Sequence, residues 1–162
     1  MMELSSMAGA VGALLKRNGQ TVAVAESSAG GLISASLLAV PGASAYFLGG
    51  AVVYTSAARA GLLGIGDDSM AGMRASTEPY AQLKARSVRA ALGTTWGLSE
   101  TGASGPTGNR YGDAAGHACI AIAGPVERVV TLETGDADRE ANMWAFAKAA
   151  LELLEQCVSE SK

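Results

Sequence analysis

The segment Thr21-Val22-Ala23-Val24-Ala25-Glu26-Ser27-Ser28-Ala29-Gly30-Gly31 decides the fold of this chain. Its first five residues are apolar or β-branched and predict a buried strand, and the apolar residues from Leu32 onward predict a helix. Between the strand and the helix lie one carboxylate, two hydroxyl groups and two glycines. A buried strand that turns directly into a helix is typical of an α/β protein.

The alternation of strands and helices continues on both sides of this segment. The predicted helices cover residues 4–16, 32–38, 56–63 (capped by Thr55), 78–92 (capped by Thr77) and a last helix capped by Asp136 or Asp138. The predicted strands cover residues 21–25, 46–54, 96–101, 117–123 and 128–134, the last two forming a hairpin. We therefore predict a three-layer α/β/α sandwich with a mixed, mostly parallel central sheet, in a single domain over residues 1–162.

Composition narrows the class of protein. The chain has 162 residues, a usual length for one domain, and 17% of them are charged, where about a quarter is usual. Because its surface is poor in charge, we expect part of it to be buried between subunits of a homo-oligomer. The net charge of −3 and the lack of a basic cluster argue against a nucleic-acid partner.

The sequence also lacks signals for a membrane or for export. Its apolar runs are too short to span a bilayer, and no basic segment precedes an apolar run at its start. We expect a cytoplasmic protein with no membrane partner. Cys119 and Cys157 do not have the spacing of metal ligands, so two buried, reduced thiols are predicted.

The turn from Glu26 to Gly31 is the first candidate site. Glycines allow a backbone to approach a ligand closely, and the N–H groups at the start of a helix favour an anion or oxyanion. A serine at this place can act as a nucleophile. The alternative is a structural one, in which Ser27 or Ser28 caps the helix.

Four further features carry polar groups, and each also has a structural interpretation. Ser44 follows Pro41-Gly42, as a turn residue would. Tyr54 and Arg59 stand five residues apart, where a strand gives way to a helix. The loop 102–116 begins with a glycine-rich segment whose backbone can hold a phosphate or ribose. The lone histidine, His117, is more often structural than catalytic at such a position.

Together these features resemble the CinA C-terminal domain family, in its stand-alone form. The segment 21–31 is similar to the family's T-x-x-x-A-E-S-C-T-G-G. Similar matches follow in the family's order at Pro41-Gly42-Ala43-Ser44-Ala45-Tyr46-Phe47, Gly49-Gly50-Ala51-Val52-Val53-Tyr54-Thr55, Ala75-Ser76-Thr77-Glu78-Pro79, Gly102-Ala103-Ser104-Gly105-Pro106-Thr107-Gly108 and Thr134-Gly135-Asp136 with Arg139. The resemblance runs from about residue 4 to residue 155.

The resemblance implies hydrolysis of nicotinamide mononucleotide to nicotinate mononucleotide and ammonia, with no metal and no cofactor. It assigns the catalytic positions to Ser27, Ser44, Tyr54 and Arg59. The sequence does not decide which serine attacks, and we favour Ser44 as the nucleophile with Ser27 as the relay. The substrate-binding residues that we predict are Glu26, Ser28, Gly30, Gly31, Gly102, Ser104, Gly105 and Thr107.

This chain departs from the family at the catalytic base. The family has lysine at the position of Arg59, and a guanidinium group stays protonated at neutral pH, so it cannot accept the serine proton. Ala29 also stands where the family often has threonine. Two hypotheses follow: an amidohydrolase with an altered base, or a catalytically inactive family member that binds a nucleotide or a protein partner.

Overall fold

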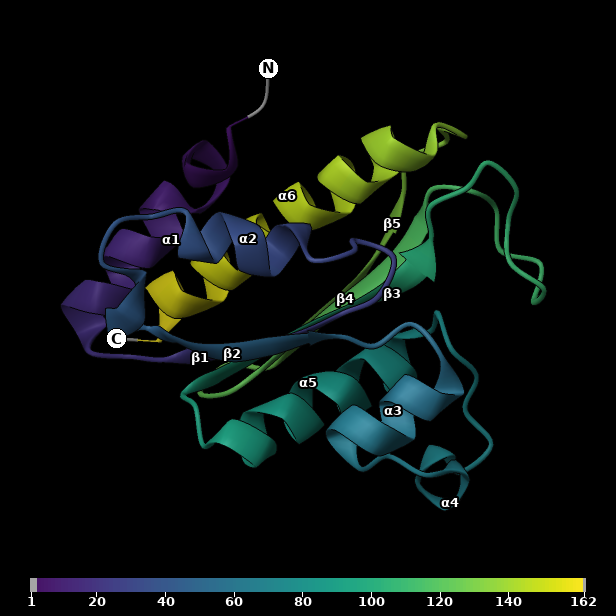
Figure 1. Ribbon diagram of the computed structural model, residues 1–162, viewed down its shortest axis with the longest axis horizontal. Helices are drawn as coiled ribbons and strands as arrows, with labels where there is room; N and C mark the ends of the chain where they lie inside the picture. Colours follow the sequence, from purple (N-terminus) through teal and green to yellow (C-terminus); the bar gives the residue numbers. More distant parts are fainter. Residues whose placement is uncertain (1–2, 162) are drawn as a thin grey trace.

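Five strands form one mixed sheet, with helices on both faces (Figure 1). The computed structural model describes residues 3–161. The strands are β1 (Val22–Glu26), β2 (Phe47–Val52), β3 (Trp96–Ala103), β4 (His117–Ala123) and β5 (Arg128–Glu133). Their order is β2-β1-β3-β4-β5: β1 pairs in parallel with β2 and β3, and β4 pairs antiparallel with β3 and β5. All strands except β4 thus run in one direction, which confirms the predicted mixed, mostly parallel sheet.

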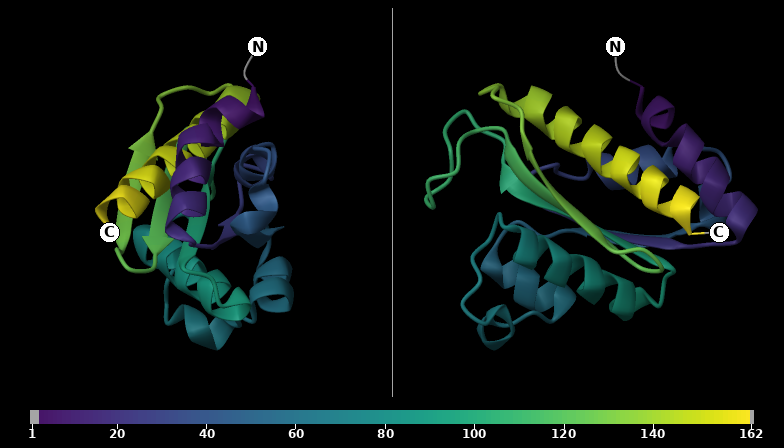
Figure 2. Two further views of the ribbon diagram at one scale, coloured as in Figure 1. Left: turned by 90° about the vertical axis from the view of Figure 1, so that its left-hand side faces the viewer. Right: turned by 180° about the vertical axis from the view of Figure 1, so that it is seen from behind.

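The helices form the two outer layers (Figures 1 and 2). One layer contains α1 (Leu4–Asn18), α2 (Leu32–Leu38) and α6 (Arg139–Glu160), and the other contains α3 (Ser56–Leu63), α4 (Asp67–Met70) and α5 (Glu78–Leu92). The three-layer sandwich is therefore confirmed. The sequence did not predict α4 or the single 3-10 turn η1 (Ala43–Ala45), because both are too short to show a hydrophobic period.

The helix caps explain where several helices begin. Thr55 and Thr77 accept backbone hydrogen bonds at the starts of α3 and α5, as predicted. Of the two candidates for the last helix, Asp138 is the cap and accepts the Ala141 N–H at 3.1 Å. Asp136 instead accepts the Asp138 N–H, and this bond fixes the residues that precede the cap.

The buried side chains on the two faces of the sheet differ in size. Beneath α1, α2 and α6, large side chains such as Trp96, Ile120 and Phe146 are fully buried. Beneath α5 the packed side chains are small, being mostly Ala81, Ala85 and their alanine neighbours on β4. This side of the core explains much of the alanine content, since small side chains let α5 lie close to the sheet.

Cys119 and Cys157 are buried and free, as predicted. No helix within residues 3–161 has both the length and the apolar character needed to cross a bilayer. In the same part of the chain, His, Cys, Asp and Glu side chains nowhere form a group of three able to hold a metal ion.

A substitution at Gly97 tests the close approach of α5 to β3. A Cβ atom at Gly97 would overlap the carbonyl oxygen of Ala85 on α5, so Gly97→Ala is expected to lower the free energy of unfolding by about 1–3 kcal/mol. Gly61 on α3 is the matched control, because a Cβ there meets no neighbour. Gly61→Ala should raise stability by about 0.5–1 kcal/mol. Urea denaturation of both variants measures these changes, and equal stabilities would contradict the packing described.

Candidate functional site

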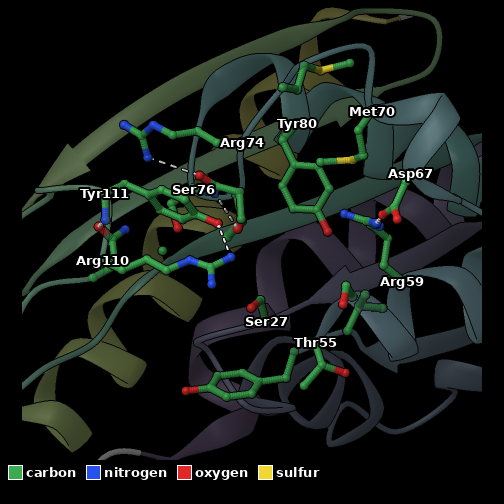
Figure 3. Close-up of a pocket in the computed structure, with 18 residues that line it drawn as sticks. Ser27, Thr55, Arg59, Asp67, Met70, Arg74, Ser76, Tyr80, Arg110 and Tyr111 are labelled. Carbon is green, nitrogen blue, oxygen red and sulfur yellow. Dashed lines mark hydrogen bonds and ion pairs between the residues drawn. The ribbon is translucent and has the colours of Figure 1, made fainter.

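A cavity of about 940 Å³ lies at the carboxyl ends of β1, β2 and β3 (Figure 3). Ligands of open α/β sheets commonly bind beyond this end of the strands. The lining comes from the ends of the three strands, from α3 and α4, from the first turn of α5 and the segment before it, and from the loop before β4. The polar and charged side chains among these residues are Ser27, Tyr54, Thr55, Ser56, Arg59, Asp67, Arg74, Ser76, Tyr80, Thr101, Asn109, Arg110 and Tyr111.

The predicted site residues fall into three groups. Ser27, Tyr54, Arg59 and Gly102 line the cavity. A second group does not line it but surrounds the turn behind Ser27 and the loop that follows β3; it consists of Glu26, Ser28, Gly30, Gly31, Ser104, Gly105 and Thr107. Ser44 forms the third group by itself, because it lies far from the cavity.

Ser44 is at the opposite end of the sheet from Ser27. It is exposed in η1, before β2 begins, whereas Ser27 follows the last residue of β1. Because β1 and β2 are parallel, the start of one strand is remote from the end of the other. The four residue steps of β1 alone span about 13 Å. The predicted relay between Ser44 and Ser27 is therefore not formed within one chain.

Glu26 is a helix-capping residue here, which corrects its predicted contact with substrate. Its side chain is fully buried. Its oxygens accept N–H groups from Gly31 at 3.1 Å, Ile33 at 2.9 Å and Ser34 at 2.7 Å. Neither Ser27 nor Ser28 caps α2, so the structural alternative considered for them is also wrong. Burial raises the pKa of Glu26, although the backbone hydrogen bonds act in the opposite direction.

Glu100 holds the other part of the same turn. Its carboxylate accepts the N–H groups of Ser27 at 3.0 Å and Ala29 at 2.8 Å, and the Ser28 hydroxyl also donates to it. The backbone donors expected to bind an anion or oxyanion are thus occupied by two carboxylates of the chain itself. The turn is rigidly held, but it does not offer those N–H groups to a ligand.

Lys84 lies beneath these carboxylates and completes a buried cluster of charges. It is fully buried on α5, and its Nζ donates to the Glu100 carbonyl at 2.8 Å. Burial lowers the pKa of Lys84 to about 8, while the negative charges of Glu100 and Glu26 oppose that shift. Its ammonium group also lies 5.2 Å from the centre of the Tyr80 ring, which separates it from the cavity.

Arg59 is fixed in place by its neighbours. Its Nε donates to the Ile65 carbonyl at 3.1 Å, and its Nη2 contacts Asp67 at 2.5 Å. The Arg59 side chain is only 11% exposed, whereas that of Asp67 is 95% exposed. A charged guanidinium with two acceptors is a binding or structural group, so this geometry offers no route to a general base at position 59.

Two more arginines enter the cavity from the other side. Arg74 forms a bidentate ion pair with Asp113, at 2.8 and 3.2 Å, and this pair lowers the pKa of Asp113. The Arg110 guanidinium extends toward the space near Ser27 (Figure 3) and donates to the Tyr111 hydroxyl at 3.0 Å. Within residues 3–161, Arg110 has no carboxylate partner. Arg74 and Arg110 lie 4.9 and 5.1 Å from the centre of the Tyr111 ring.

His117 has a structural role, which agrees with the sequence analysis, where a lone histidine at a strand start was expected to be structural rather than catalytic. It is nearly buried, with Nδ1 2.6 Å from Glu133 and Nε2 2.8 Å from the Ser76 carbonyl. Burial disfavours its charged form, but Glu133, the Ser76 carbonyl and Asp113 outweigh burial and raise the pKa of His117. It thereby ties the start of β4 to Ser76, which lines the cavity.

Sequence reasoning missed the buried charges, although the sequence contained a signal for each. Glu100 interrupts an otherwise apolar or small strand. Lys84 falls in the buried stripe of α5 together with Ala81, Ala85 and Val88. A charged residue on the apolar side of an element is rare unless it has a partner. Arg74 and Arg110 had no such signal, since only the fold brings their segments to one cavity.

The fold and the site define an α/β sandwich with an arginine-lined cavity at the ends of its parallel strands, and comparison with known proteins places it in a family. The sequence model of the CinA C-terminal domain matches residues 4–158. The chain therefore belongs to the CinA C-terminal domain family.

Relatives and solved structures agree with this assignment. CinA-like proteins of Gloeobacter violaceus and Myxococcus xanthus are each 43% identical, over 80% and 88% of this chain. The chain spans only 31% and 34% of their lengths. A competence damage-inducible protein A from Klebsiella pneumoniae has the same fold, with a TM-score of 0.91 at 22% identity and nearly complete coverage of both chains. The Agrobacterium tumefaciens protein CihA matches at 25% identity with a TM-score of 0.87, over 99% of this chain and 98% of its own.

The buried amine of Lys84 predicts a dependence of stability on pH. In the folded protein it loses its proton near pH 8, and in the unfolded chain near pH 10.4. Between these values the unfolded state binds more protons, so the free energy of unfolding should rise with pH. Lys84→Met removes this contribution, and its stability should fall behind that of the wild type as pH rises from 7.5 to 10.

Urea titrations at several pH values measure this difference. Lys148→Met is the matched control, since Lys148 is an exposed lysine on α6. Its stability should stay parallel to that of the wild type. If the difference in the free energy of unfolding between the wild type and Lys84→Met were the same at every pH, the assigned burial of the Lys84 amine would be contradicted.

Proposed function

We propose that the cavity binds a small anionic nucleotide of the nicotinamide mononucleotide type, and that this chain is a binding member of its family. The observation that carries the proposal is the cavity lining. Three guanidinium groups line it, whereas no lysine or histidine of residues 3–161 does. Guanidinium groups bind phosphate well but do not abstract protons.

The distribution of charge supports an anionic ligand. Arg59 and Arg74 are each neutralised by a carboxylate, Asp67 and Asp113, but Arg110 has no carboxylate partner in the described part of the chain. The positive charge of Arg110 is thus available to pair with an anionic ligand. The partly exposed Tyr111 ring beside Arg110 offers a surface on which an aromatic base can stack.

Amide hydrolysis by a serine needs a base and a stabilised oxyanion, and the observed geometry supports neither in one chain. Arg59 stands where the resemblance predicts a lysine, and its guanidinium contacts Asp67 and the Ile65 carbonyl. The N–H groups of Ser27 and Ala29 are bound to Glu100. These contacts favour binding over hydrolysis.

The second candidate function is amide hydrolysis, and one observation favours it. Ser27 lines the cavity at the end of β1, and its hydroxyl makes no hydrogen bond to another residue in 3–161. A serine so placed can attack a bound carboxamide if a base from another source takes its proton. The two candidates share the ligand and differ in turnover.

Arg110 should contribute strongly to ligand affinity. Arg110→Ala is expected to weaken binding of nicotinamide mononucleotide by about tenfold or more, because a charge-assisted hydrogen bond contributes about 1.5–3 kcal/mol. Isothermal titration calorimetry measures the affinity. Arg86→Ala is the control: Arg86 pairs with Glu127 on the surface and does not line the cavity. Equal affinities for all three proteins would refute the assigned role of Arg110.

Turnover separates the two candidate functions. The wild-type protein is expected to release no ammonia from nicotinamide mononucleotide above the uncatalysed rate, since a base is missing. Arg59→Lys supplies an amine at that position and tests whether this residue alone blocks the reaction. Ammonia release by the wild type that Ser27→Ala abolishes would overturn the binding-only proposal in favour of hydrolysis. The acid product, measured by chromatography, provides the independent readout.

A further inference from the structure

The guanidinium groups that line the cavity stand at two ends of it (Figure 3). Arg74 and Arg110 lie beside the Tyr111 ring at one end. Arg59, on α3, lies at the other end, and Ser27 is drawn between the two ends. A ligand that fills the cavity therefore meets a cation at each of its own ends.

The charges of the lining are unbalanced. Three guanidinium groups line the cavity against a single carboxylate, that of Asp67, among residues 3–161. Asp113 pairs with Arg74 from outside the lining. The Asp67 side chain is 95% exposed, so water screens its attraction for Arg59, as it does for most surface ion pairs. Positive charge thus remains available at the Arg59 end as well as at Arg110.

Arg59 also keeps an unused donor. Its Nε donates to the Ile65 carbonyl and its Nη2 to Asp67, whereas its Nη1 donates to no other residue within 3–161. The side chain is only 11% exposed, so the protein holds the guanidinium in place on most sides. Unused guanidinium N–H groups form strong, charge-assisted hydrogen bonds with a carboxylate. The Arg59 end is therefore suited to a second anionic group of the ligand.

Two nucleotides of the proposed type differ only in the group on their pyridine ring. Nicotinamide mononucleotide has a neutral carboxamide there, and nicotinate mononucleotide has a carboxylate. In both, the bond from the ring nitrogen to the ribose gives the ring a positive charge. The amide thus brings a second cation toward Arg59, whereas the acid brings an anion. Like charges disfavour the first arrangement and opposite charges favour the second.

We propose that Arg59 makes the cavity selective for the acid, nicotinate mononucleotide, over the amide. This inference rests on the proposed function, because it assigns an orientation to the same type of ligand. The phosphate lies at Arg110, which has no carboxylate partner in the described part of the chain. The ring carboxylate lies at Arg59 and bonds to its Nη1. Arg59 is then the residue that determines which of the two nucleotides is bound.

A comparison of the two ligands tests the selectivity. In isothermal titration calorimetry, the wild type should bind the acid about tenfold or more tightly than the amide, as expected for one charge-assisted contact. Arg59→Gln should lose most of this preference, mainly by weaker binding of the acid. Arg17→Gln, at an exposed position on α1, is the matched control and should keep the preference.

Equal affinities of the wild type for the two ligands, or tighter binding of the amide, would overturn the proposed selectivity. A preference for the acid that persists in Arg59→Gln would overturn the role of Arg59.

Asp67→Asn distinguishes this role from a merely structural one. Without the Asp67 charge, Arg59 has no competing carboxylate, so the variant should bind the acid more tightly and the amide about as before. Asp68→Asn removes the neighbouring exposed charge, which does not line the cavity, and should bind both ligands as the wild type does. If Asp67→Asn weakened both ligands alike, the Arg59–Asp67 pair would be structural and the inference would fail.

Arg110→Ala tests the orientation and separates this inference from the proposed function. Because the phosphate is common to both ligands, this variant should bind both more weakly by the same factor, leaving the ratio of affinities unchanged. A lowered ratio would place the carboxylate at Arg110 and refute the assigned orientation. If the wild type bound neither ligand, the proposed function and this inference would both fail. Equal binding of both ligands would refute the selectivity alone.

Discussion

The structure around the site depends on the Glu100 carboxylate, which is buried under the turn that joins β1 to α2. Its bonds to Ser27, Ser28 and Ala29 connect β3 to that turn, and Glu26 fixes the following residues to the start of α2. Two buried carboxylates close together are costly unless they are well hydrogen-bonded and partly compensated. The hydrogen bonds of the turn and the nearby Lys84 provide both, and this explains why a lysine is buried in α5.

This constraint determines where a ligand can be held. The start of α2 is the usual place for a phosphate in an α/β protein, but its donors are used internally. Positive charge that can face a ligand comes instead from Arg110, on the loop between β3 and β4. The positive charge available to the proposed ligand is therefore on the arginines opposite the helix start, which supports the proposed binding function.

The direction of the strands also places Ser44 out of reach of the site. Parallel pairing of β1 and β2 separates Ser44 from Ser27 by the length of the strands.

The sequence by itself determined the layers, the mixed sheet, the caps at Thr55 and Thr77 and the turn after β1, because these depend on local periodicity and on short-range hydrogen bonds. The resemblance to the family also predicts a lysine at the position where this chain has Arg59. Only the tertiary structure decided that Ser44 lies away from Ser27, that Arg74 and Arg110 share a cavity, and that Glu26 and Glu100 use the donors of the turn. The reason is physical: strand order and direction set these distances, and they arise from packing between segments that are remote in the chain.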